Sequence, residues 1–181
     1  MEALGMIELV SIAKGIEAGD AIVKTAEVKL ISAMASCPGK YVVLVRGRVA
    51  AVRSAIEVGA KTAGKTLVNH IIIPNVHDQV FTALSQTTEV EPGDSVGVIE
   101  TYSLATSVLV ADAAVKAASV EILEIRLGRG LGGKAFVVLS GDVSSVRAAV
   151  DAAVNANGEE GMIAHTAVIP RINKDMLRTL L

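Results

Sequence analysis

The sequence of 181 residues contains a single cysteine, no tryptophan, two tyrosines and two phenylalanines. With one cysteine, no disulfide can form within the chain, which suits a reducing compartment or a thiol that is shared between chains. The aromatic residues are too few and too scattered to form a platform on which bases stack. They are Tyr41, Phe81, Tyr102 and Phe136.

Long hydrophobic runs are also missing, although 51% of the residues are hydrophobic. The apolar segment 107–111 ends at Asp112, far short of the length that crosses a membrane. The N-terminus has no basic segment followed by an apolar run and a cleavage site, so we expect no secretory signal. These features favour a cytoplasmic protein that has no membrane partner.

Blocks of one charge are absent as well. There are 17 basic and 19 acidic residues, a net charge of -2, and the lysines and arginines do not cluster along the chain. A nucleic-acid partner is therefore not expected. What the chain has in abundance is small and aliphatic residues, more than two small cores need, which indicates buried interfaces between subunits.

One sequence pattern occurs twice. The offset between the copies grows from 92 to 96 residues, because turns tolerate insertions. The paired segments are 5–8 with 97–100, 20–24 with 112–116, 39–40 with 133–134, and 73–74 with 169–170. So few copies of so long a repeat indicate duplicated domains rather than a solenoid. We expect domains over 1–88 and 95–181, with a polar linker at 87–94.

Each copy has the same predicted order of strands and helices, β-α-β-β-α-β. In the first copy, strands are expected at 3–10, 28–35, 41–45 and 67–73, and helices at 16–26 and 49–63. In the second copy, strands are expected at 95–101, 120–127, 135–139 and 162–169, and helices at 106–118 and 143–157. This order is the α+β ferredoxin-like unit, an antiparallel sheet with both helices on one face. The fold alone names no function.

The duplicated segments resemble those of the shell proteins of bacterial microcompartments. The similar runs are Gly5-Met6-Ile7-Glu8, Asp20-Ala21-Ile22-Val23-Lys24, Gly39-Lys40 and Ile73-Pro74, each with its counterpart in the second half. Tandem members of that family form pseudohexameric trimers. The resemblance thus implies a homotrimer with a structural, non-enzymatic role, located in the microcompartment shell within the cytoplasm, with other shell proteins as partners.

Among the tandem members, the sequence is most similar to the iron-sulfur-carrying shell protein of the propanediol-utilisation microcompartment. Its pore loop contains a Cys-Pro-Gly-Lys turn, which Cys37-Pro38-Gly39-Lys40 matches. The resemblance implies that three Cys37 thiolates, one per subunit, hold a shared [4Fe-4S] cluster on the three-fold axis. Such a cluster usually takes four thiolates, so one iron would bind another ligand. The implied role is electron transfer across the shell, with an electron-transfer protein as a further partner.

The equivalent turn in the second copy is glycine-rich and has no sulfur. It does not match a phosphate-binding loop, because Ala135 follows Lys134 where that motif needs serine or threonine. The resemblance places both turns near the trimer centre, where Arg129 adds positive charge; a solvated loop arginine is an equal alternative. The predicted pore-loop residues are Ser36, Pro38, Gly39, Gly128, Arg129, Gly130 and Gly132.

The resemblance also implies tile-edge residues that contact neighbouring tiles. Lys24 and Lys116 each follow an aspartate by four residues on a predicted helix, a pair that is otherwise worth only about 0.2–0.5 kcal/mol. The family closes its domain with an Ile-Pro-Arg-Pro-His segment, and each copy keeps a different part of it. The remaining predicted edge residues are Asn75 and His77 in the first copy and Arg171 in the second.

Two other readings of Cys37 stay open at this point. The chain can be a shell tile without a cluster, in which the axis is a metabolite pore and the cysteine is a small hydrophobic residue. It can also be a ferredoxin-like trimeric regulator or enzyme that uses Cys37 as a nucleophile. That reading needs a cation to activate the thiolate, for which Lys40 is the nearby candidate.

Overall fold

The computed structural model describes residues 2–86, 92–128, 130–156 and 161–180. They form two compact units, Met1–Val76 with Gly128–Gly133, and His77–Leu127 with Lys134–Leu181. The glycine-rich turn of the second copy thus groups with the first unit. The domain limits 1–88 and 95–181 stay a prediction about the duplication, and most of the predicted linker lies outside the described residues.

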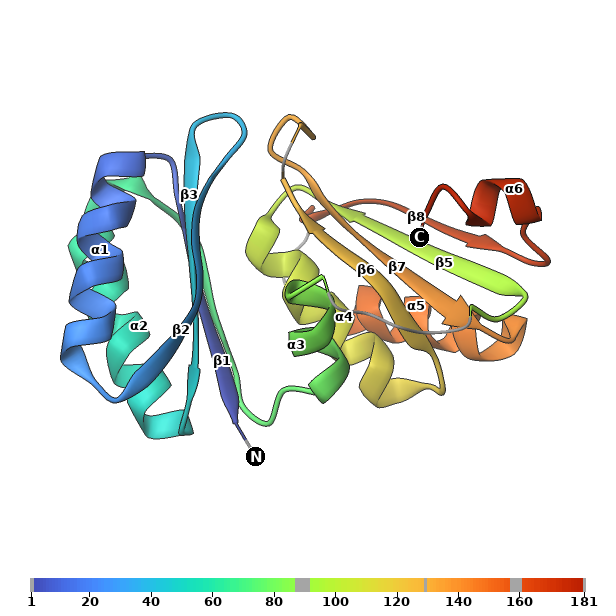
Figure 1. The fold of residues 1–181 in the computed structure, drawn as a ribbon, viewed down its shortest axis with the longest axis horizontal. Coiled ribbons are helices and arrows are strands. Elements are labelled where there is room, and N and C mark those ends of the chain that lie inside the picture. The colour runs from blue at the N-terminus through green and yellow to red at the C-terminus, as the bar shows by residue number, and fades with distance from the viewer. Residues whose placement is uncertain (1, 87–91, 129, 157–160, 181) are drawn as a thin grey trace. The chain divides into compact units, whose positions relative to one another are not determined.

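The first unit is one sheet with two helices on one face (Figure 1). Its sheet has the order β2-β3-β1-β4, and every neighbouring pair is antiparallel. The elements are β1 (Ala3–Leu9), α1 (Ile12–Thr25), β2 (Val28–Ser36), β3 (Lys40–Gly47), α2 (Val49–Ala63), a 3-10 turn (Gly64–Thr66) and β4 (Leu67–Ile73).

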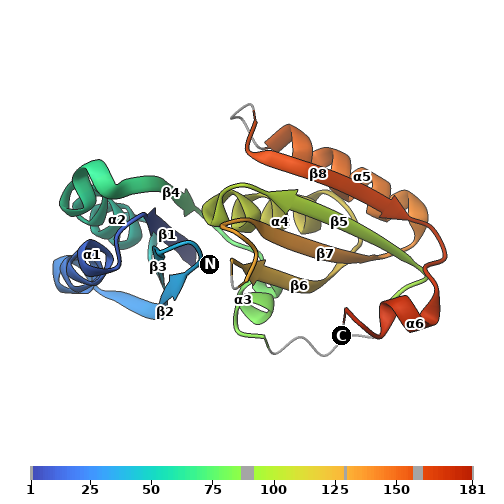
Figure 2. The same cartoon turned by 90° about the horizontal axis from the view of Figure 1, so that it is seen from above.

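The second unit repeats this arrangement, with the strand order β6-β7-β5-β8 (Figure 2). Its elements are α3 (Asp78–Leu84), β5 (Ser95–Thr101), α4 (Leu104–Ala117), β6 (Glu121–Leu127), β7 (Ala135–Gly141), α5 (Val143–Ala156), β8 (Ile163–Ile169) and α6 (Lys174–Leu177). The predicted ferredoxin-like order is confirmed in both copies.

The core of the first unit lies between the helices and one face of the sheet. Alternate residues of β1 and β3, among them Ile7 and Val43, pack there with Ile22 of α1 and Ile56 of α2. Gly5 brings β1 close to α2, since a Cβ at this position would lie 2.6 Å from Cγ1 of Ile56. The repeated glycine of the sequence pattern is therefore a packing requirement.

Helix ends differ from the predictions where a capping side chain decides them. α1 begins at Ile12 rather than at 16, because the Ser11 hydroxyl accepts from the Lys14 N–H at 3.3 Å. Ser103 caps α4 in the same way. α2 ends at Ala63 as predicted, and Gly64 follows as its C-cap with φ of 54°. The predicted end of α5 at 157 lies outside the described residues.

Two short helices, α3 and α6, are absent from the sequence-based prediction. Each follows the last strand of its copy and begins after a side-chain cap, His77 or Asn173. With 7 and 4 residues they are too short to show helical periodicity. Across the described parts of the chain, no helix is both long enough and apolar enough to span a bilayer.

Candidate functional site

The turn between β2 and β3 carries the only cysteine. Cys37, Pro38 and Gly39 form its exposed tip, and Ser36 at the end of β2 is buried. Cys37 is a free thiol and the Cys37–Pro38 peptide bond is cis. Gly39 has φ of 79°, the left-handed region that glycine adopts without strain. The sequence therefore presents its one sulfur to solvent at the end of a hairpin.

The glycine-rich turn of the second copy packs directly against this tip. The Cys37 N–H donates to the Gly128 carbonyl at 3.3 Å. A Cβ on Gly133 would lie 2.9 Å from Cδ of Pro38, and Gly133 has φ of 89°, so this contact requires glycine. Gly130 and Gly132 also have positive φ. The structure thus brings the two predicted turns together, while Arg129 lies outside the described residues.

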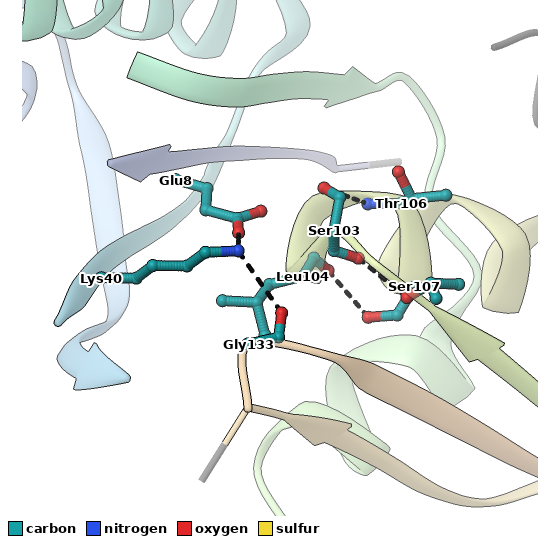
Figure 3. A network of polar contacts seen from close by, with 8 residues as sticks. Glu8, Lys40, Ser103, Leu104, Thr106, Ser107 and Gly133 are labelled. Carbon is teal, nitrogen blue, oxygen red and sulfur yellow. Dashed lines mark hydrogen bonds and ion pairs between the residues drawn. The ribbon is translucent and has the colours of Figure 1, made fainter. Parts of the chain in front are cut away.

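A buried ion pair stands beside the two turns (Figure 3). The Lys40 ammonium lies 2.6 Å from Oε1 of Glu8, whose side chain is 0% exposed. It also donates to the Gly133 carbonyl at 3.3 Å, so the same lysine bonds to β1 and to the glycine-rich turn. Sequence spacing could not have paired Glu8 with Lys40, because they are 32 residues apart and meet through strand pairing.

The second copy has the equivalent pair in a more exposed setting. Lys134 lies 2.9 Å from Glu100, whose side chain is 36% exposed. The hydrogen bond to Glu100 and the charge of that carboxylate raise the pKa of Lys134. The duplicated sequence therefore contains the lysine–glutamate pair twice. Of the two ion pairs, the one beside Cys37 has the buried carboxylate.

An iron-sulfur cluster at the Cys37 turn would need thiolates from several symmetry-related copies of the chain. Among the described residues, no group of three or more histidine, cysteine, aspartate or glutamate side chains is placed to hold a metal. A single chain therefore offers one thiolate, Cys37. The residue fits a cluster because its turn is exposed, so that thiols of other copies can approach it.

The predicted edge residues lie on helices and tails. Lys24 is exposed and bonds to Asp20 at 2.6 Å, and Lys116 pairs with the largely buried Asp112. His77 lies with this second pair, because its N–H donates to Oδ1 of Asp112 at 2.8 Å. Asn75 and Arg171 occupy equivalent turns after the last strands, both exposed and both with positive φ. Their contact with other tiles stays a prediction.

The family model named BMC domain matches the chain twice, over residues 3–76 and 95–172. The chain therefore belongs to the BMC-domain family, the shell proteins of bacterial microcompartments, and it is a tandem member.

Three similar proteins agree with this. The chain is 42% identical over 179 residues to the bacterial microcompartment shell protein PduT of Citrobacter freundii, covering 99% of this chain and 97% of that protein. A microcompartment protein from Desulfitobacterium hafniense has a crystal structure with a TM-score of 0.90 at 46% identity, covering 98% and 99% of the two chains. The fused permuted hexameric shell protein MSM0275 from the RMM microcompartment gives 0.66 at 26% identity, covering 86% and 83%.

The resemblance read from the duplicated motifs is thus confirmed. The chain is a structural protein of a microcompartment shell, built from two ferredoxin-like domains in tandem.

Proposed function

We propose that three copies of this chain form a shell tile in which the Cys37 thiolates hold one [4Fe-4S] cluster on the three-fold axis. The single observation that carries the proposal is the position of the lone cysteine. Cys37 lies at the exposed tip of a hairpin. This tip packs against the glycine-rich turn, which is the counterpart of the Cys37 turn in the second copy. A lone cysteine that served only as core filling would be buried.

The chemistry of the donor set supports a cluster shared between chains. Thiolates are the usual ligands of [4Fe-4S] clusters, and three identical chains related by an axis supply three of them. The fourth iron then takes a water, a small ligand or a partner group. When bound, the cluster supplies one-electron transfer, and its place within a shell favours transfer of electrons between the two sides.

The proposed partners follow from the position in a shell. Lateral contacts with other shell proteins would use the exposed Lys24 and the residues after the last strands, Asn75, His77 and Arg171. An electron-transfer protein would dock over the three-fold axis. The pair of Glu8 and Lys40 holds the Cys37 hairpin and the second turn together, which keeps the thiol in a defined position.

Anaerobic purification tests the proposal. We expect a brown protein with broad visible absorbance, and loss of that absorbance in Cys37→Ser. The matched control is the double variant Cys37→Ser, Ser54→Cys, which keeps one thiol per chain but places it on the exposed side of α2. The control is expected to stay colourless, and a wild-type protein that is iron-free after anaerobic preparation would contradict the proposal.

A tile with an open metabolite pore is a second candidate. The observation in its favour is the second turn, in which a Cβ at Gly130 or Gly132 would meet nothing within 4 Å. In that case, iron-free trimers would pass small polar molecules, and Cys37→Ser would assemble and conduct like the wild type.

A further inference from the structure

The two turns that join the paired strands differ in length and in backbone conformation. Residues 37–39 join β2 to β3, whereas residues 128–134 join β6 to β7. Glycines with φ between 61° and 89° occur along the longer turn, in a region that other residues enter only at a cost. They are Gly128, Gly130, Gly132 and Gly133. The longer turn thus follows a path that its glycines make possible.

The two ends of the longer turn face the Cys37 hairpin. Gly128 and Gly133 are buried, unlike the two glycines between them. A Cβ on Gly133 would lie 2.9 Å from Cδ of Pro38, which is closer than side chains approach. It would also meet the Cys37 carbonyl oxygen at 3.5 Å and the Lys40 ammonium at 3.6 Å. The hairpin therefore fills the space that a side chain at position 133 would need.

Hydrogen bonds hold both ends of the longer turn. The Cys37 N–H donates to the Gly128 carbonyl at 3.3 Å. The Lys40 ammonium donates to the Gly133 carbonyl at 3.3 Å, and the ion pair with the buried Glu8 holds this lysine in turn (Figure 3). Both bonds to the turn are long for N–H···O bonds. The turn is therefore fixed by these bonds together with the close packing at Gly133, rather than by one strong bond.

The first of these bonds also decides where the amide beside the sulfur points. The Cys37 N–H carries one hydrogen, and this hydrogen is directed at the Gly128 carbonyl. Hydrogen-bond donors to sulfur, and water, favour the more negative reduced form of an iron-sulfur cluster and so raise its reduction potential. The longer turn thus withdraws one donor from the surroundings of the thiolate.

We propose that the glycine-rich turn of the second copy positions the Cys37 thiolate for cluster binding and keeps the Cys37 amide away from the sulfur. The inference rests on the cluster of the proposed function. It assigns the ligand to the first copy and the support of that ligand to the second. Gly133 is a positioning residue, because it acts through Pro38 and the backbone of Cys37 and binds no iron.

A pair of glycine variants tests the positioning role. Gly133→Ala places a methyl group against the hairpin. The matched control is Gly161→Ala, because Gly161 has φ of 90° against 89° at Gly133, and its added Cβ would meet nothing within 4 Å. Both variants carry the same backbone strain, but only Gly133→Ala disturbs Pro38. Circular dichroism and native mass spectrometry check that both variants fold and assemble as the wild type does.

The first readout is the loss of visible absorbance when anaerobically purified protein is mixed with an iron chelator. We expect Gly133→Ala to lose its absorbance at least about tenfold faster than the wild type, in line with the effect of residues that orient metal ligands. Gly161→Ala should lose it at the wild-type rate.

The second readout is the midpoint potential, measured by redox titration followed by electron paramagnetic resonance. In Gly133→Ala the Cys37 amide and water gain access to the sulfur, so the midpoint should move to a more positive potential than in the wild type and in Gly161→Ala. A glycine needed only for folding would lower the yield of loaded protein and leave the midpoint of the remaining clusters unchanged.

A second pair of variants acts on the turn without changing a glycine. The double variant Glu8→Gln, Lys40→Met removes the bond to the Gly133 carbonyl and leaves no buried charge unpaired. Its control is Glu100→Gln, Lys134→Met, the same changes in the equivalent, more exposed pair. We expect faster loss of absorbance in the first double variant and not in its control. This comparison decides the question if Gly133→Ala does not fold.

The outcomes separate the inference from the proposed function. Cluster lifetimes and midpoint potentials equal to those of the wild type, in Gly133→Ala or in Glu8→Gln, Lys40→Met where Gly133→Ala does not fold, would overturn the positioning role and leave the cluster itself intact. Equal effects of Gly133→Ala and Gly161→Ala would assign the change to backbone strain and would also overturn it. A wild-type protein that is iron-free after anaerobic preparation would contradict the proposed function, and this inference with it.

Discussion

At the scale of single residues, the two copies differ most in the setting of one lysine. Lys40 and Lys134 each pair with a glutamate of the first strand in their copy, but only the carboxylate of Glu8 is fully buried. A buried carboxylate depends on its counter-charge far more than an exposed one does. Lys40 of the buried pair lies at the end of the hairpin that carries Cys37, so the Cys37 turn is tied to Glu8 on β1.

Removal of Lys40 should therefore be costly. Lys40→Ala leaves Glu8 buried without its ammonium partner, and we expect the free energy of unfolding to fall by about 3 kcal/mol. The equivalent change Lys134→Ala should have a much smaller effect, because solvent screens the Glu100 pair. Urea unfolding of both variants measures the difference. An equal decrease in the free energy of unfolding in the two variants would contradict the expectation that burial of Glu8 depends on Lys40.

At the scale of elements, local sequence was enough for the strands and the long helices. Alternation and three-to-four spacing predicted β1, β5, α2 and the order of strands and helices along each copy, because each copy has its own apolar core. The beginnings of α1 and α4 were placed too late, since the capping serines, and not the apolar pattern, decide them. α3 and α6 were missed because short helices depend on a cap and on tertiary contacts, which periodicity does not reveal.

A cap also makes α5 sensitive to acid. Hydrogen bonds from the Ser144 hydroxyl, and from the N–H and hydroxyl of Ser145, lower the pKa of Asp142 well below the usual 3.8. Because the pKa is lower in the folded state, the carboxylate stabilises the fold fully above the usual value, and this contribution is lost as the pH falls below it.

We therefore expect Asp142→Ala to lower the melting temperature by a few degrees at neutral pH, and by progressively less as the pH falls below the usual carboxyl pKa. Arg48, the counterpart of Asp142 before α2, makes no side-chain cap, so Arg48→Ala should show no such pH dependence. Thermal unfolding followed by circular dichroism from neutral to acidic pH makes the comparison. A constant difference between Asp142→Ala and the wild type at all pH values would contradict the account.

At the scale of the whole molecule, duplication produced two similar domains with different turns. Sequence alone identified the family, the tandem architecture and the Cys37 turn, because these reside in contiguous motifs. It did not reveal that Cys37 contacts Gly128 or that His77 bonds to Asp112, since these pairs lie far apart in the sequence and meet only after folding. The proposed cluster, with one ligand from each chain, would likewise be a property of the assembly.

The most direct test of the central claim is the stoichiometry of iron and sulfide. Anaerobically purified protein should be analysed for iron, acid-labile sulfide and protein, and weighed intact by native mass spectrometry. The account predicts one [4Fe-4S] cluster for every three chains, carried by the trimer and lost in Cys37→Ser without loss of the trimer. Trimers of wild-type protein that bind no iron, or iron that persists in Cys37→Ser, would contradict it.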